Sequence, residues 1–149
     1  MAKAFHLRPY RAEDEGAAIA LWLESWRQTY PEIDFGARVT WWRARWQKEL
    51  VPNATVIVAE QSGALTGFVT IDNKGYLDQL VVAPTHWGSA LGNALLDEAK
   101  RLSPDQITLL VNADNARAIR FYERNGFVQA GGEVNPTSGR PVLRMEWEG

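Results

Sequence analysis

The sequence of 149 residues contains no cysteine. Without thiols, the chain forms neither a disulfide nor a thiolate zinc site, and it has no cysteine nucleophile. Histidine is scarce too. The two present, His6 and His86, lie far apart in the sequence. We therefore predict no metal centre. No apolar run approaches the ~18 residues that a transmembrane helix needs, so no membrane span is expected.

An excess of charge of one sign is also lacking. Sixteen Lys and Arg stand against 18 Asp and Glu, for a net charge of −2. This balance gives no general attraction to nucleic acid or to an anionic membrane, so we expect neither as a partner. The first residues, MAKAFHLRPYRAEDE, lack the apolar core of a signal peptide, which favours a cytoplasmic location. The length and the 46% hydrophobic content fit a single domain over residues 1–149.

Apolar spacing and turn residues predict the order β-α-α-β-β-β-α-β-α-β-β. Strands are expected at residues 4–9, 55–60, 64–72, 76–82, 106–111, 127–133 and 142–147, and helices at residues 11–30, 35–50, 91–101 and 115–125. This order predicts a mixed α/β (α+β) domain in which an antiparallel meander is joined to a βαβ crossover. The crossover strands 76–82 and 106–111 should be parallel, and the second reads as buried on both faces.

The carboxyl ends of parallel strands are where ligands bind in such sheets. Here those ends carry the loop 84–92 and the segment 112–115. Gly88 and Gly92 flank the start of a helix, whose first N–H groups have no partner inside the helix and attract anions. The loop therefore fits an anion site, and equally a tight turn between a strand and a helix.

The segment NARAIRFYERNGF, residues 115–127, is the second motif. On a helix, Asn115 and Tyr122 share a face and lie about 10 Å apart along the axis. They could touch two separated parts of one long ligand. The alternative is a helix-capping Asn and a packed Tyr.

Together, VVAPTHWGSALG and NARAIRFYERNGF resemble the two motifs of the GCN5-related N-acetyltransferase (GNAT) family. The order of strands and helices agrees with that fold over essentially the whole chain. The resemblance implies an acetyl-CoA-dependent N-acetyltransferase that transfers acetyl directly to a primary amine of a small molecule or a peptide. The alternative is a non-catalytic acyl-CoA sensor or interaction module with the same fold.

The resemblance also implies roles for single residues. Backbone amides of the loop would hold the pyrophosphate of acetyl-CoA, at Trp87, Gly88, Ser89, Ala90, Leu91, Gly92 and Asn93. The preceding strand would hold the pantetheine arm and polarise the acetyl carbonyl at Leu80, Val81 and Val82, with a bulge that splays it from the next parallel strand. Asn115 would contact the arm, and Tyr122 would protonate the departing thiolate as general acid.

The sequence departs from the family pattern at three positions. Trp87 stands where the family has Arg or Gln, and Ala90 stands where it has Gly. The alanine is tolerated if its φ is negative, because the phosphate contacts come from backbone N–H groups. Leu110 occupies the place of the glutamate base in the branch that acetylates ribosomal protein N-termini, which argues against that substrate.

The general base is open at this point. Asp78 is the first candidate and Tyr76 the second, and a solvated strand residue explains Asp78 as well. For the acceptor amine, we expect contacts from Trp26, Tyr30 and Glu32, in the segment between the first two helices. Core packing is the expected role of most aromatic residues in those helices. The protein is expected to be a monomer or a homodimer, with the last strand, 142–147, as a possible dimer edge.

Overall fold

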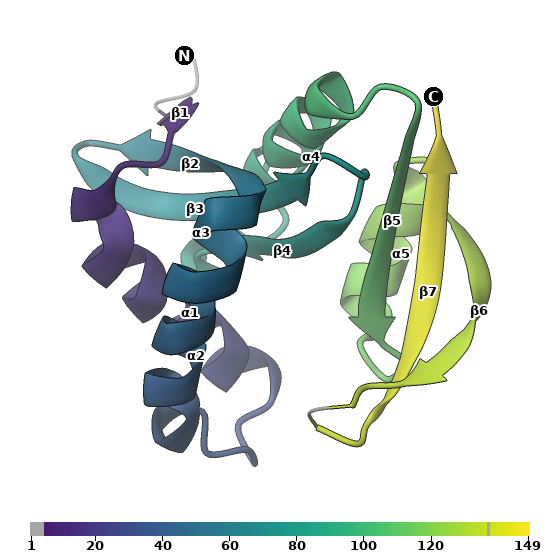
Figure 1. Ribbon diagram of the computed structural model, residues 1–149, viewed down its shortest axis with the longest axis horizontal. Helices are drawn as coiled ribbons and strands as arrows, with labels where there is room; N and C mark the ends of the chain where they lie inside the picture. The colour runs from purple at the N-terminus through teal and green to yellow at the C-terminus, as the bar shows by residue number, and fades with distance from the viewer. Residues whose placement is uncertain (1–4, 137) are drawn as a thin grey trace.

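The computed structural model describes residues 5–136 and 138–149 of the chain (Figure 1). The strands are β1 (Phe5–Pro9), β2 (Ala54–Gln61), β3 (Ala64–Asp72), β4 (Leu77–Val82), β5 (Gln106–Asn112), β6 (Val128–Val134) and β7 (Pro141–Glu148). The helices are α1 (Glu15–Thr29), α2 (Val39–Arg45), α3 (Val51–Asn53), α4 (Leu91–Leu102) and α5 (Ala116–Arg124). Short helical turns are η1 (Ala12–Asp14), η2 (Gly36–Arg38), η3 (Trp46–Leu50) and η4 (Pro84–His86). The predicted mixed fold and element order are confirmed, and residue 4 of the first predicted strand lies outside the described residues.

The strands form two sheets rather than one. The first has the antiparallel order β1-β2-β3-β4, and the second has the order β5-β7-β6. A parallel bridge between Tyr76 and Thr108 joins them. Beyond that bridge β4 and β5 diverge, so that the two halves open like a V (Figure 1). The two crossover strands are parallel as predicted, but they pair only at the apex of the V.

Gly75 lies at that apex, with φ +82°. A Cβ atom there would lie 2.6 Å from the carbonyl oxygen of Gln106. The carbonyl of Gly75 accepts a hydrogen bond from the amide of Thr108 at 2.9 Å. Only glycine combines this backbone conformation with so close an approach, so it fixes the point from which the sheets diverge.

Both faces of the first sheet are buried. Alternate residues of β2 point to opposite faces, so Ile57 packs with the α4 side and Val58 with the α1 and α2 side. The second face carries most of the tryptophans. The rings of Trp22 and Trp42 stack at 4.7 Å, and Trp46 packs edge-on against Phe68. Core packing is therefore the role of these three tryptophans. Among the described residues, no helix is long and apolar enough to cross a membrane.

Two local predictions need correction. The helix predicted over 35–50 is broken into η2, α2 and η3, the last of which is a π-helical turn. Strand β5 is not buried on both faces: Ile107 and Leu109 are buried, whereas Thr108 and Leu110 are half-buried. The reason is that α5 covers only one face of the second sheet (Figure 1).

Candidate functional site

The edge of β4 that faces β5 is the first part of the site. The amide of Ala83 bonds to Thr66 on β3, so by strand alternation Leu80 and Val82 turn their N–H and C=O groups toward the open V. Val81 lies between them with its backbone polar groups toward β3 and its side chain buried. Of the three residues predicted on this strand, Leu80 therefore presents a free N–H and C=O, whereas Val82 presents a free N–H only, because its carbonyl accepts bonds from Trp87 and Ser25.

A β-bulge precedes this edge. Gln79 pairs with Thr70 while Leu77 pairs with Ile71, which leaves Asp78 as the extra residue of β4. The amide of Gln79 donates to the hydroxyl of Thr70 at 3.0 Å. A bulge increases local twist, and this one lies where the strands begin to part. The predicted bulge exists, although it falls just before Leu80–Val82.

The loop after β4 presents unpaired donors. Among the described residues, no acceptor bonds the amides of Gly88, Ala90, Gly92 and Asn93, whereas Ser89 Oγ accepts a bond of 3.3 Å from the amide of Leu91. Ala90 has φ −72°, an ordinary value for alanine, so an alanine is tolerated at this position where the family has glycine. Unpaired N–H groups at the start of a helix attract phosphate through the helix dipole.

Trp87 fills the space between this loop and α5. Its indole Nε1 donates to the carbonyl of Val82 at 2.9 Å, and Ser25 Oγ donates to the same oxygen at 3.0 Å. The guanidinium of Arg117 stacks over the indole ring, 3.8 Å from its centre. Partial desolvation lowers the pKa of Arg117 from its usual value. The tryptophan thus links the end of β4 to the start of α5.

Asn115 and Tyr122 mark the two ends of one face of α5. Asn115 is the N-cap: its side-chain oxygen accepts from the amide of Ala118 at 3.2 Å, which leaves its side-chain N–H groups without a partner among the described residues. Tyr122 is buried between Phe121 and Phe127, and burial raises its pKa. No described residue bonds its hydroxyl, so Tyr122 is a neutral phenol with a free O–H.

The two candidate bases lie together near the bulge. Both oxygens of Asp78 accept bonds from Arg45, at 3.0 and 2.5 Å, and Gln79 Nε2 donates a third bond at 3.0 Å. Burial raises the pKa of Tyr76 to about 12. The two side chains line a hollow of about 260 Å³ with Arg45 and Glu49. The carboxylate of Asp78 is therefore hydrogen-bonded to the guanidinium of Arg45, and the hydroxyl of Tyr76 keeps its proton at neutral pH.

The residues predicted for the acceptor amine are split. Trp26 stacks on Tyr30, with ring centres 5.9 Å apart, and the buried Tyr30 hydroxyl donates to Asp114 at 2.7 Å. Burial and this carboxylate raise the pKa of Tyr30 to about 12. Arg140 completes the cluster, with its guanidinium over the Tyr30 ring and a 2.8 Å bond to Asp114. Glu32 is exposed and makes no hydrogen bond or ion pair with any described residue.

Sequence reasoning missed Asp114, Arg140 and Ser25 as parts of the site. Each meets its partner across a long stretch of chain: 84 residues separate Tyr30 from Asp114, and 57 separate Ser25 from Val82. No local pattern signals such contacts, because they depend on how the two halves of the molecule meet.

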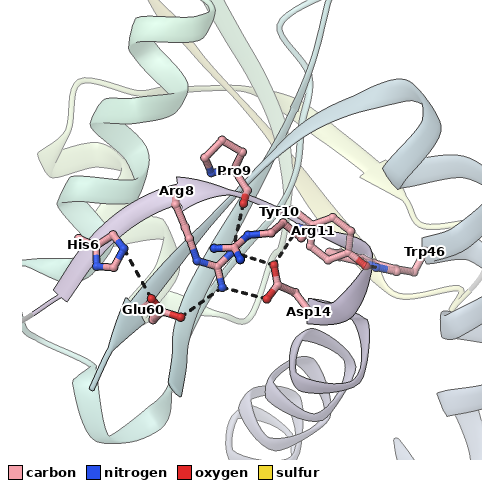
Figure 2. A network of polar contacts seen from close by, with 8 residues as sticks. All are labelled: His6, Arg8, Pro9, Tyr10, Arg11, Asp14, Trp46 and Glu60. Carbon is pink, nitrogen blue, oxygen red and sulfur yellow. Dashed lines mark hydrogen bonds and ion pairs between the residues drawn. The ribbon is translucent and has the colours of Figure 1, made fainter. Parts of the chain in front are cut away.

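Another hollow, of about 440 Å³, lies elsewhere, between the start of α1 and the β2–β3 turn. Arg8 lies in its wall, bonded to Asp14 at 2.8 and 2.9 Å and to Glu60 at 3.3 Å (Figure 2). These ion pairs tie β1, β2 and η1 together. Because Arg8, Asp14 and Glu60 already pair with one another, we do not assign this hollow to the site.

Comparison with known proteins agrees with this geometry. Residues 34–149 match the family described as an acetyltransferase (GNAT) domain. The chain is 31% identical to the peptidyl-lysine N-acetyltransferase YiaC of Escherichia coli (strain K12) over 124 residues, which are 81% of this chain and 82% of that protein. The chain belongs to the GNAT acetyltransferase family. The family predicted from the two motifs is confirmed, and with it an acetyltransferase as the kind of enzyme.

Solved structures of GNAT proteins share the fold. YjaB from Escherichia coli superposes with a TM-score of 0.79 at 24% identity, over 97% of this chain and 98% of that one. The PaiA N-acetyltransferase of Thermoplasma acidophilum, solved in complex with coenzyme A, gives 0.75 at 23% identity, over 99% and 100%. At this identity the likeness shows the GNAT fold, and it covers nearly the whole chain.

Proposed function

We propose that this GNAT protein transfers acetyl from acetyl-CoA directly to a primary amine of a small molecule or a peptide. The observation that carries the proposal is the open edge of β4, which leads straight into the unpaired amides at the start of α4. An extended, partly peptide-like ligand with a phosphate at one end fits this run of donors and acceptors. Acetyl-CoA has that form, and it supplies the reactive thioester.

The residues divide between the parts of the donor. The unpaired loop amides of Gly88, Ala90, Gly92 and Asn93 would hold the diphosphate, whereas the Ser89 amide already donates to the carbonyl of His86 at 3.2 Å. The free N–H of Val82 and the side-chain amide of Asn115 would bond the pantetheine arm. The amide of Leu80 would donate to the acetyl carbonyl oxygen, where negative charge develops during transfer. Val81 would contribute through the sheet that holds its two neighbours in place.

The chemistry needs a neutral amine and a proton for the leaving sulfur. The amine nitrogen forms a C–N bond with the thioester carbon, the C–S bond breaks, and the amine gives up one proton. Tyr122 would donate its hydroxyl proton to the thiolate, which its free O–H supports. Burial raises the pKa of Tyr122, which keeps the proton on the phenol at neutral pH but makes it a weaker acid. The proton lost by the amine would later restore the phenol through solvent.

Asp78 remains the residue to test as the base that takes the amine proton. Its pairing with Arg45 counts against this role, because the carboxylate must release a strong N–H donor before it accepts a proton. Its position at the bulge of β4, two residues from Leu80, counts in favour.

The names of the relatives suggest two classes of acceptor. Some are named peptidyl-lysine N-acetyltransferases, and a protein from Salmonella typhimurium, 29% identical over 107 residues, is named an L-methionine sulfoximine/L-methionine sulfone acetyltransferase. Both names fit a primary amine. We propose that Trp26 and Tyr30 form one wall of the acceptor path and that Glu32, exposed beside them, attracts the cationic amine before it loses its proton.

A free-thiol assay tests the function directly. The chain has no cysteine, so a thiol reagent detects only the CoA released. Wild type should release CoA with lysine peptides or with free amino acids. Tyr122→Phe should lower kcat about 100-fold and leave the Kd for acetyl-CoA within about twofold. Tyr10→Phe, which also removes one phenol O–H, is the matched control and should keep kcat.

The outcomes separate the possibilities. Binding of acetyl-CoA without CoA release across a broad amine panel would favour the acyl-CoA sensor instead. A protein that does not bind acetyl-CoA at all would exclude both. Full turnover in Tyr122→Phe would remove the general-acid role and leave the transferase assignment standing.

A further inference from the structure

The loop at the start of α4 has no cation of its own. Residues 84–93 contain no lysine or arginine. The single histidine, His86, is held through Nε2 by Gln61 at 2.6 Å and through Nδ1 by Thr85 at 3.1 Å. Within this loop, only backbone N–H groups, which carry partial positive charge, would face the formal negative charges of the diphosphate.

Arg117 brings a guanidinium to this loop from another element. It is the second residue of α5, and its charged group stacks on the ring of Trp87 at 3.8 Å. Stacking uses the flat face of a guanidinium and leaves the N–H groups at its edge free to bond oxygen atoms. Arg117 makes no ion pair or hydrogen bond with any described residue, so these donors are unused.

Trp87 fixes where this charge lies. Its indole N–H is bonded to the carbonyl of Val82, so the ring is tied to the end of β4. A large flat ring held at one edge limits the positions of the guanidinium above it. The other arginines of α5, Arg120 and Arg124, have no such contact with the loop.

We propose that Arg117, positioned by Trp87, binds the diphosphate of the CoA donor. This inference rests on the proposed function and adds a residue to it. The unpaired amides of Gly88, Ala90, Gly92 and Asn93 would face the diphosphate from the start of α4, and the guanidinium would face it from α5. The tryptophan that replaces Arg or Gln in the loop thus holds in place a cation supplied by a different helix.

The test compares three donors with the same acetyl group and arm. Acetyl-CoA carries the diphosphate and the 3′-phosphate, acetyl-dephospho-CoA keeps only the diphosphate, and S-acetylpantetheine has neither. Acetyl-dephospho-CoA should lose as much affinity as acetyl-CoA when Arg117 is removed, and a loss confined to acetyl-CoA would assign Arg117 to the 3′-phosphate instead. In Arg117→Ala, the Kd for acetyl-CoA should rise about 10- to 100-fold, as expected for the loss of a charge-assisted contact. The Kd for S-acetylpantetheine should change less than about twofold. Arg124→Ala removes an equal charge about 10 Å further along the same helix and is the matched control.

A double-mutant cycle tests the part of Trp87. Trp87→Ala should weaken acetyl-CoA binding, and the double variant with Arg117→Ala should be little weaker than Arg117→Ala alone, because the two residues act together. Trp87→Phe keeps a ring beneath the guanidinium but loses the bond to Val82, so its affinity should lie between those of wild type and Trp87→Ala. Additive losses would mean that the ring does not position Arg117.

Two results would overturn the inference while leaving the transferase assignment intact. One is a wild-type affinity for acetyl-CoA in Arg117→Ala. The other is an equal loss for acetyl-CoA and S-acetylpantetheine, since this would indicate a structural effect. Arg117→Met, which keeps the stem over the indole, should behave as Arg117→Ala does if charge is the cause. Failure of the wild type to bind acetyl-CoA would instead refute the proposed function.

Discussion

The hydroxyl of Tyr30 donates a hydrogen bond of 2.7 Å to Oδ1 of Asp114. Tyr30 follows α1 in the first half of the molecule, and Asp114 follows β5 in the second. The Tyr76–Thr108 bridge joins the same two halves at the apex of the V. The Tyr30–Asp114 contact closes the far end, beyond the carboxyl end of β5, and so limits how widely the two sheets can part.

Removing the Tyr30 hydroxyl should loosen this closure. Tyr30→Phe keeps the ring between Trp26 and Arg140 and deletes only the hydrogen bond. We expect the free energy of unfolding in urea to fall by about 1 kcal/mol. Glu32→Gln, an exposed change nearby, should alter it by less than about 0.5 kcal/mol. An unchanged stability in Tyr30→Phe would show that the bond does not hold the halves together.

The ion pair of Arg8 and Asp14 should make stability depend on acidity. The bond to Arg8 holds the pKa of Asp14 below its ordinary value of 3.8. The stabilisation is therefore complete above about pH 4 and is lost as the pH falls through the lowered folded-state pKa. Asp14→Asn should cost about 1–3 kcal/mol at pH 7, because it removes the closest charged partner of the half-buried Arg8 guanidinium and leaves only the longer contact with Glu60.

The same variant gives the pH test. Its stability deficit relative to wild type should shrink steadily below about pH 4, when the wild-type carboxyl takes up a proton. Glu98→Gln removes a partner of the exposed Arg101 and should cost less than about 1 kcal/mol at any pH. A deficit of Asp14→Asn that stays constant down to pH 2 would contradict this account.

Gly75 should be the costliest loop glycine to replace. Gly75→Ala adds a Cβ atom 2.6 Å from the Gln106 carbonyl, at φ +82°. Gly63 has nearly the same φ, +80°, with no atom within 4 Å of the added Cβ. Gly63→Ala therefore measures the backbone cost alone, about 1 kcal/mol. Gly75→Ala should lower the free energy of unfolding in urea by about 1–3 kcal/mol more than Gly63→Ala does. Equal losses would mean that the backbone at the apex shifts at little cost to make room for the Cβ atom.

The variant Asp78→Asn tests whether the carboxylate of Asp78 has a structural or a catalytic role. From its bidentate pairing with Arg45, we expect a loss of about 1–2 kcal/mol in stability and an unchanged acidic limb in the pH profile of kcat/KM. If Asp78 is the base, that limb should vanish and kcat/KM should fall about 100-fold or more. Tyr76→Phe, measured in parallel, tests the second candidate.

The sequence by itself determined the order of strands and helices, although not the breaks within residues 35–50. The apolar, β-branched run at 55–60 and the helical spacing of apolar residues in α4 reflect the local geometry of the backbone, which a short window of sequence reports. The two motifs, with Gly88, Gly92, Asn115 and Tyr122 at their spacing, were also enough to indicate the family. These features depend on residues that lie close together within one segment of the sequence.

Only the tertiary structure decided which side chains are free to act. It paired Asp78 with Arg45, set the guanidinium of Arg117 over Trp87, and joined Tyr30 to Asp114. It also divided the strands into two sheets and left one face of β5 without a covering helix. The physical reason is that these contacts join segments about 30 to 84 residues apart, so they follow from the packing of whole elements and leave no local pattern in the sequence.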